Sequence, residues 1–219
     1  MKYFIDQEFI EGFKKPLFGK KRHFIDLISI GIVAEDGRKY YAISNEFNYN
    51  DADDWVKENV ISKLKFWKDG EGYMKSGMYL YGMEAVKFIG KSNKEIADDI
   101  FRFVHYPVYK KWDDKLSFIE EIVDSAYEQG EADHEFYGYY SDYDWVLFCS
   151  LFGRMIDLPK GFPMYMRDLK QTLDEKYPTS KELTEIKLNP FKFPQQTDEH
   201  HALADAEWNL KLYEFLNKL

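Results

Sequence analysis

Hydrophobic and polar residues are distributed along this chain in a pattern that predicts an α/β fold. Short runs of apolar, aromatic and β-branched residues alternate with segments whose apolar residues have helical spacing. The runs predict strands over residues 3–8, 24–34, 39–47, 135–140 and 164–167. The helical segments are 51–60, 93–104, 115–129, 144–152, 168–176 and 200–218. Three successive strands followed by strands alternating with helices favour a mixed sheet of about five strands with helices on both faces.

Four segments refine this picture. Residues 25–33 are apolar on both faces of the expected strand, so this strand should be central and buried. Residues 35–37, Glu-Asp-Gly, predict the hairpin turn that follows it. Residues 61–92 show no clear period. Residues 177–196 contain three prolines and predict a long loop, which could gate a site before the last helix.

Two carboxylates, Asp6 and Glu8, lie two residues apart in the first expected strand. Side chains on a strand alternate between its faces, so both carboxylates leave the same face. Adjacent buried anions repel each other, and a hard cation such as Mg²⁺ or Mn²⁺ would relieve that repulsion. The pair therefore indicates a metal site, with a polar stripe on an exposed edge strand as the alternative.

A third acidic element occurs where the fourth expected strand meets a helix. Asp142 and Asp144 precede an apolar helical run, at the carboxyl end of that strand. Open α/β sheets place their sites at this end of the strands. The alternative is that one of these residues only caps the helix.

The last motif pairs His200 with Asp205 near the start of the final helix. Five residues of helix rotate a side chain by roughly 140°, so the two cannot share a face if both are helical. They can converge if His200 precedes the helix and Asp205 lies in its first turns. Thr197 and Asp198 are the candidate N-caps for that boundary.

Together, these motifs resemble the DEDDh family of 3′–5′ exonucleases, whose members have the RNase H-like fold. Within that family, the chain is most similar to a small bacterial and phage group of exoribonuclease-like proteins. The likeness lies in residues 4–10 with 25–33, in 142–153, and in 200–206. These stretches follow the family's order across almost the whole chain, so residues 1–219 are expected to form one exonuclease domain.

The resemblance implies a role for each matching residue. It makes His200 the general base and leaves His201 at a variable position. It implies two Mg²⁺ or Mn²⁺ ions, held by the carboxylates of Asp6, Glu8, Asp144 and Asp205. Many family members have an asparagine where this chain has Tyr140, and this departure leaves Asp142 open as an alternative to Asp144.

The same chemistry follows from the substrate that such a site would hydrolyse. A phosphodiester is anionic, and two divalent ions about 4 Å apart can clamp the attacking and leaving oxygens of an in-line displacement. Four carboxylates would hold two such ions with little leftover charge. A neutral imidazole can accept the proton of the attacking water near pH 7.

Substrate contacts are expected directly after Glu8 and in the loop that follows the first strand. The resemblance implies that Phe9 and Ile10, directly after Glu8, pack against the terminal nucleotide, although Phe9 could instead belong to the core. A basic segment follows, and Lys14 and Lys15 in it could hold the substrate backbone beside the metals. Its other members are Lys20, Lys21 and Arg22. The alternative is that this segment is a solvated connector.

Composition narrows the expected partner. The chain has 219 residues and a net charge of −9, which argues against tight, nonspecific binding of long nucleic acid. A short oligonucleotide, or only the 3′ end of a longer single strand of RNA or DNA, fits better.

Cys149 is the only cysteine, which excludes an intrachain disulfide. The first residues show no signal-peptide core and no apolar run is long enough to span a membrane, so a cytoplasmic enzyme, monomeric or homodimeric, is expected.

Three functions fit the sequence. The leading hypothesis is a metal-dependent 3′–5′ exonuclease that acts on single-stranded nucleic acid. The second is an endonuclease or another phosphoesterase with the same fold and metals. The third is a noncatalytic nucleic-acid-binding module, against which the intact set of polar residues counts. The sequence leaves the choice between RNA and DNA open.

Overall fold

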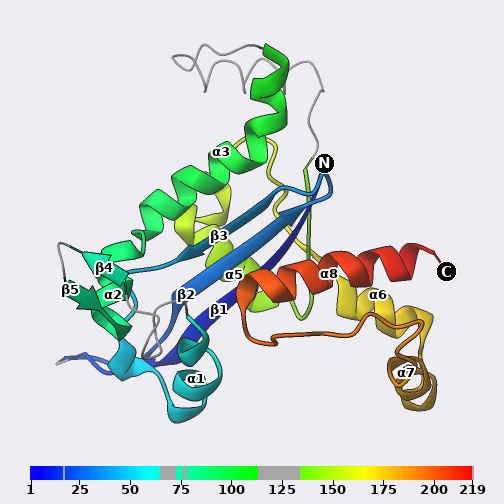
Figure 1. The fold of residues 1–219 in the computed structure, drawn as a ribbon, viewed down its shortest axis with the longest axis horizontal. Helices are drawn as coiled ribbons and strands as arrows, with labels where there is room; N and C mark the ends of the chain where they lie inside the picture. Colours follow the sequence, from blue (N-terminus) through cyan, green and yellow to red (C-terminus); the bar gives the residue numbers. More distant parts are fainter. Residues whose placement is uncertain (17, 65–72, 76–77, 113–133, 219) are drawn as a thin grey trace.

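The computed structural model describes the whole chain except residues 17, 65–72, 76–77, 113–133 and 219 (Figure 1). Its main strands are β1 (Lys2–Lys14), β2 (Arg22–Ala34), β3 (Lys39–Ile43), β6 (Glu135–Gly138) and β7 (Arg167–Asp168). A small hairpin is formed by β4 (Tyr73–Lys75) and β5 (Met78–Leu80). The α-helices in the described residues are α1 (Asp54–Asn59), α2 (Gly82–Ile89), α3 (Asn93–Trp112), α5 (Asp142–Phe152), α6 (Leu169–Lys176), α7 (Ser180–Lys187) and α8 (Ala202–Asn217).

The main sheet is mixed and has the strand order β3-β2-β1-β6-β7. The first three strands form an antiparallel meander, while β6 pairs in parallel with β1, and β7 pairs in parallel with β6. The predicted α/β class and five-stranded mixed sheet are confirmed. The fifth strand is Arg167–Asp168, so the prediction of 164–167 began too early.

Helices cover both faces of this sheet, as predicted. On one face, Tyr3 and Ile5 pack in a core with α3 and α5, which contribute Ile100 and Phe148. On the other face, Phe4 packs in a second core with α6 and α8. Because side chains alternate along β1, the residues that follow Phe4 at every second position, Asp6 and Glu8, belong to the α8 face.

The start of α8 lies directly on β2 at Gly31. A Cβ atom at this position would overlap the backbone of Ala202 and would lie 2.5 Å from Leu203 Cα. Gly31 is paired with Asp6 across the strands, so this close contact brings the helix beside the first carboxylate. The buried amide of Asn209 secures the same helix by donating a hydrogen bond to the Ile5 carbonyl oxygen at 2.9 Å.

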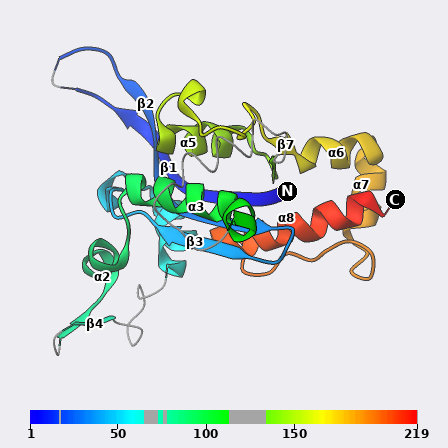
Figure 2. The same ribbon diagram turned by 90° about the horizontal axis from the view of Figure 1, so that it is seen from above.

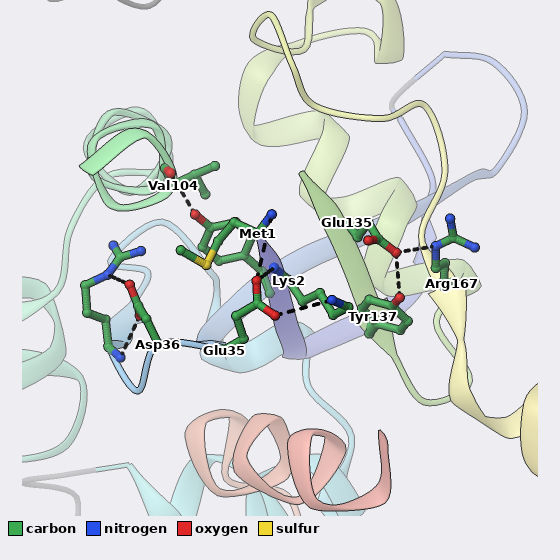
Figure 3. A network of polar contacts seen from close by, with 10 residues as sticks. Met1, Lys2, Glu35, Asp36, Val104, Glu135, Tyr137 and Arg167 are labelled. Carbon is green, nitrogen blue, oxygen red and sulfur yellow. Dashed lines mark hydrogen bonds and ion pairs between the residues drawn. The ribbon is translucent and has the colours of Figure 1, made fainter. Parts of the chain in front are cut away.

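A network of charged side chains links the strands at the amino end of β1 (Figure 3). Lys2 Nζ lies 3.3 Å from Glu35 Oε2, which joins β1 to the turn after β2. On the other side, Glu135 accepts a hydrogen bond from Tyr137 at 2.6 Å and pairs with Arg167 at 3.1 Å. Exposed pairs of this kind stabilise a fold by about 1 kcal/mol or less each.

The ends of β1 and β2 continue beyond the sheet as a two-stranded arm (Figure 2). The sequence predicted a loop after residue 8, but the antiparallel pairing runs on to Lys14 and Arg22. The ladder shifts register between Glu8 and Phe9, at the point where the arm leaves the body. The basic segment therefore lies at the tip of an arm.

Several predicted elements need correction. The predicted loop 177–196 contains helix α7, which begins with a reciprocal capping box between Thr179 and Glu182. Strand β3 ends at Ile43 rather than at residue 47, and α5 begins two residues earlier than expected. The predicted helix 115–129 lies outside the described residues.

No helix in the described part of the chain is long and apolar enough to cross a membrane.

The contact at Gly31 yields a testable prediction. Gly31→Ala should displace the start of α8, because the added methyl group meets backbone atoms that cannot rotate away. Overpacking of this kind costs about 1–3 kcal/mol. Thermal unfolding should show the loss of stability, and Mn²⁺ titration should show weakened binding, because Asp205 moves with the helix.

Gly37→Ala is the matched control for this substitution. Gly37 has φ +89° in the β2–β3 turn, and a Cβ atom added there would have no neighbour within 4 Å. Alanine there should lower stability through backbone strain but leave Mn²⁺ affinity unchanged. Equal Mn²⁺ affinities for the two variants would contradict the role given to Gly31.

Candidate active site

The carboxylates of Asp6 and Glu8 project from β1 toward α8. Glu8 is 9% exposed, and Asp6 is half-buried. Their partners across the ladder are Gly31 and Ser29, on the central buried strand β2. The pair is therefore not a stripe on an exposed edge strand.

Asp144 reaches β1 from the first turn of α5. Strand β6 pairs with β1 only as far as Phe4, so the N–H of Gln7 lies beyond the end of that ladder. Asp144 Oδ1 accepts a hydrogen bond from this N–H at 2.9 Å, and the Gln7 side chain donates to the Asp144 carbonyl oxygen at 2.5 Å. Asp144 is 7% exposed, whereas Asp142 is exposed to solvent at the start of the helix. Of the two candidates, Asp144 is the one that the structure brings to Asp6 and Glu8.

Asp205 and His200 meet as the sequence required, with His200 ahead of the helix and Asp205 in its first turn. The N–H of His200 donates to Asp205 Oδ2 at 2.7 Å, and Gln196 Nε2 donates to Oδ1 at 2.6 Å. His200 has φ +65°, a left-handed conformation that reverses the chain just before α8. Each of Glu8, His200 and Asp205 offers one potential ligand atom, and these atoms all lie within 4.8 Å of one another.

The two carboxylates on β1 are under electrostatic stress, because burial and nearby negative charges disfavour their charged forms. Burial raises the pKa of Asp6 well above its ordinary value, and the negative charges of the other three carboxylates raise it further. Burial, followed by the charges of Asp205 and Asp144, raises the pKa of Glu8 to about 8, and the charge of Lys63 opposes this shift. The charges that raise these two pKa values place Asp6 and Glu8 close to each other, to Asp144 and to Asp205.

The other two carboxylates are stabilised in part by hydrogen bonds. Burial raises the pKa of Asp144 to about 7, although the N–H of Gln7 favours the charged form. Burial also raises the pKa of Asp205, against the opposing hydrogen bonds from Gln196 and His200. Burial thus outweighs these hydrogen bonds, and the pKa values of Asp144 and Asp205 stay raised.

This donor set fits hard divalent cations. Mg²⁺ and Mn²⁺ favour carboxylate oxygens, and bound cations would lower the raised pKa values of the cluster.

His201 has a structural position that the sequence did not indicate. It is the N-cap of α8, where its Nδ1 accepts the N–H of Ala204 at 3.4 Å. Its ring is stacked on Tyr41 with centroids 4.9 Å apart. Thr197 and Asp198, the predicted caps, therefore do not cap the helix. His201, which the resemblance left at a variable position, has this structural role instead.

The residues predicted to bind substrate lie in different environments, some of them buried and others exposed. Phe9 is half-buried against the core on the α5 face, and it also lines a pocket of about 480 Å³ with Glu8 and Trp55. Ile10 is 1% exposed and packs inside a third core, which leaves little of it accessible to a nucleotide. Lys14 is paired with Asp26 at 2.9 Å and Asp51 at 3.2 Å. Lys15 is exposed on the arm.

Three further residues at the site carry no recognisable sequence signal. Trp55 lies edge-on to His200, with ring centroids 4.9 Å apart. Lys63 donates to the Glu199 carbonyl oxygen and is the cation that favours ionised Glu8. Gln196 binds Asp205 from the segment predicted to be a loop. Trp55 and Lys63 are distant in sequence from the motif that they support, so local pattern could not identify them.

A buried group of carboxylates with an adjacent histidine, at the centre of an α/β sheet, defines a class of site suited to divalent cations and phosphoester hydrolysis. The chain matches the 3′-5′ exoribonuclease Rv2179c-like domain over residues 1–216, and it belongs to that family. Two relatives from Mycobacterium tuberculosis are named 3′-5′ exoribonuclease Rv2179c and 3′-5′ exoribonuclease MT2234.1. Each is 29% identical over 216 residues, which cover 99% of this chain and 93% of the relative. The family confirms the expected enzyme class, an exonuclease-type hydrolase.

The electrostatic stress yields a second prediction. Asp6→Asn should stabilise the metal-free protein, because it removes a charge whose pKa is raised by folding. An acid with a raised pKa in the folded state lowers stability as the pH rises, so the gain should be larger near pH 9 than near pH 5. A gain of ~1 kcal/mol would raise the melting temperature in EDTA by about 2–4 °C.

Asp36→Asn is the control with the opposite sign. Burial raises the pKa of Asp36, but hydrogen bonds from Arg38 outweigh it and lower the pKa overall. Removing that charge should destabilise the protein. An Asp6→Asn variant that melts below the wild type in EDTA would contradict the stress assigned to the carboxylate cluster.

Proposed function

We propose that this protein is a metal-dependent 3′–5′ exonuclease of single-stranded nucleic acid, with RNA as the preferred substrate. The observation that carries the proposal is the convergence of four carboxylates and His200 in a family of 3′-5′ exoribonucleases. Asp6, Glu8, Asp144 and Asp205 would hold two Mg²⁺ or Mn²⁺ ions. When bound, these ions would supply positive charge to the phosphodiester and acidify the attacking water.

His200 is the proposed general base. Its N–H is bonded to Asp205, which ties its backbone to the carboxylate cluster, and the edge-on contact with Trp55 limits the rotation of its ring. A neutral imidazole in this place accepts the proton of the attacking water. Phe9, which lines the pocket beside Glu8, offers an apolar contact for the terminal nucleotide.

The sheet supports a finer assignment of the fold. An antiparallel meander followed by two parallel strands, in the order β3-β2-β1-β6-β7, is the arrangement expected for the RNase H-like fold. The carboxylates lie on β1, at the start of α5 and in the first turn of α8, which is the DEDDh pattern inferred from the sequence. We therefore assign residues 1–219 to a single DEDDh exonuclease domain.

Metal removal and end-blocking test the reaction. Excess EDTA should abolish the degradation of a 5′-labelled single-stranded RNA, because the carboxylates alone cannot neutralise the phosphate charge. Mn²⁺ or Mg²⁺ should restore a ladder that shortens from the 3′ end, and a blocked 3′ hydroxyl should prevent it. Cleavage in EDTA would exclude the metal mechanism, and fragments from a circular RNA would indicate an endonuclease.

The two neighbouring histidines separate catalysis from stability. His200→Ala should lower turnover on the order of 10²–10⁴-fold while Mn²⁺ binding largely persists. His201→Ala should lower stability by about 0.5–2 kcal/mol through loss of the cap and leave turnover of the folded protein nearly unchanged. Rates, melting temperatures and Mn²⁺ affinities of both variants decide the matter. If His201→Ala is the inactive variant, the assignment of the base is wrong.

A further inference from the structure

A line of aromatic rings leads away from the carboxylates along the arm. It begins at Phe9, next to Glu8, and continues through Tyr143 and His23 to Phe13. The successive ring centroids lie 6.0, 6.3 and 5.5 Å apart. Tyr143 is 45% exposed and Phe13 is 66% exposed, so both present ring surface to solvent. The pocket beside Glu8 also extends along β1 as far as Phe13.

Two acidic side chains near this line have partners on the arm. Glu11 Oε1 lies 2.8 Å from His23 Nε2, and Asp26 is paired with Lys14. The cations nearer the tip are exposed, and they give this end of an acidic protein a local positive charge. They are Lys15, Lys20, Lys21 and Arg22. Phe18, between them, is 88% exposed.

Positive charge combined with exposed aromatic rings is the surface that single-stranded nucleic acid recognises. Phosphates bind the cations, and bases stack on rings without regard to sequence. Lys14 comes six positions after Glu8 along β1, a distance of about 20 Å at the rise of an extended strand. Roughly six stacked nucleotides would cover this distance at 3.4 Å each, whereas a dinucleotide would not reach the tip.

We propose that the β1–β2 arm binds the single-stranded RNA that lies 5′ of the nucleotide being removed, with phosphates on the tip cations and bases on the aromatic line. This inference rests on the proposed function, because it assumes that a 3′ end occupies the carboxylate site. The arm gives the enzyme a preference for longer strands. It also explains how a chain with a net charge of −9 holds a polyanion.

The test compares two RNA lengths in a tip variant. Lys15, Lys20, Lys21 and Arg22 are all changed to Ala, and kcat/KM is measured on a 12-nucleotide oligouridylate and on a uridine dinucleotide. The 12-mer should lose on the order of 10–100-fold at low salt, with a smaller salt dependence of KM. The dinucleotide should change by less than about twofold. Equal losses on both lengths, or none on the 12-mer, would overturn the proposal.

A matched control carries the same change in net charge elsewhere. Lys181, Lys192, Lys211 and Lys218 are exposed on or near α7 and α8, and their quadruple Ala variant should keep the length preference. If it loses the 12-mer preference equally, general charge rather than the arm is responsible. Melting temperatures of both variants establish that each is folded. Phe18→Ala, at an exposed side chain, separates stacking from charge and should weaken only the 12-mer.

Binding measurements keep this inference distinct from the proposed function. Anisotropy of a 5′-fluorescein 12-mer in EDTA reports on the arm without catalysis. If the wild type cleaves neither RNA but binds the 12-mer more tightly than the tip variant, the proposed function fails and the arm surface stands. If cleavage occurs and both proteins bind equally, the arm proposal fails alone.

Discussion

The mutual repulsion of four carboxylates is the constraint on which the rest of the structure depends. Asp6, Glu8, Asp144 and Asp205 each have a raised pKa, and burial is the largest cause for all four. Burying these four carboxylates lowers the stability of the fold, so the surrounding structure must hold them together. The two apolar cores, on either face of the sheet, provide the stabilisation that opposes this repulsion. Bound cations would relieve this repulsion, and that relief would increase the affinity of the cluster for them.

Backbone geometry determines where these groups meet. Strand β6 pairs with β1 only as far as Phe4, so the N–H of Gln7 is available to donate a hydrogen bond to Asp144. Gly31 has no side chain, so α8 can lie against β2 and bring Asp205 to the same place. The left-handed turn at His200 then aims another N–H at Asp205. Two of the carboxylates are thus bound by main-chain donors, which are rigid and cannot withdraw as a side chain would.

The molecule divides its charge between two regions. The sheet centre concentrates negative charge suited to cations, while the arm tip carries Lys15, Lys20, Lys21 and Arg22. A polyanionic strand would be repelled by the overall charge of −9 and attracted at these two places, one through metal ions and the other directly. The long pairing of β1 with β2 joins both regions, because β1 runs from Glu8 to Lys14, which pairs with Arg22 beside the tip.

The sequence by itself determined the features that depend on local periodicity. Alternation along a strand placed Asp6 and Glu8 on one face, and helical rotation required His200 to precede the helix of Asp205. Tertiary structure decided what depends on contacts distant in sequence. It distinguished buried Asp144 from exposed Asp142. It also made His201 the cap of α8, and it extended β1 and β2 into an arm, because strand pairing and packing follow from the whole fold rather than from neighbouring residues.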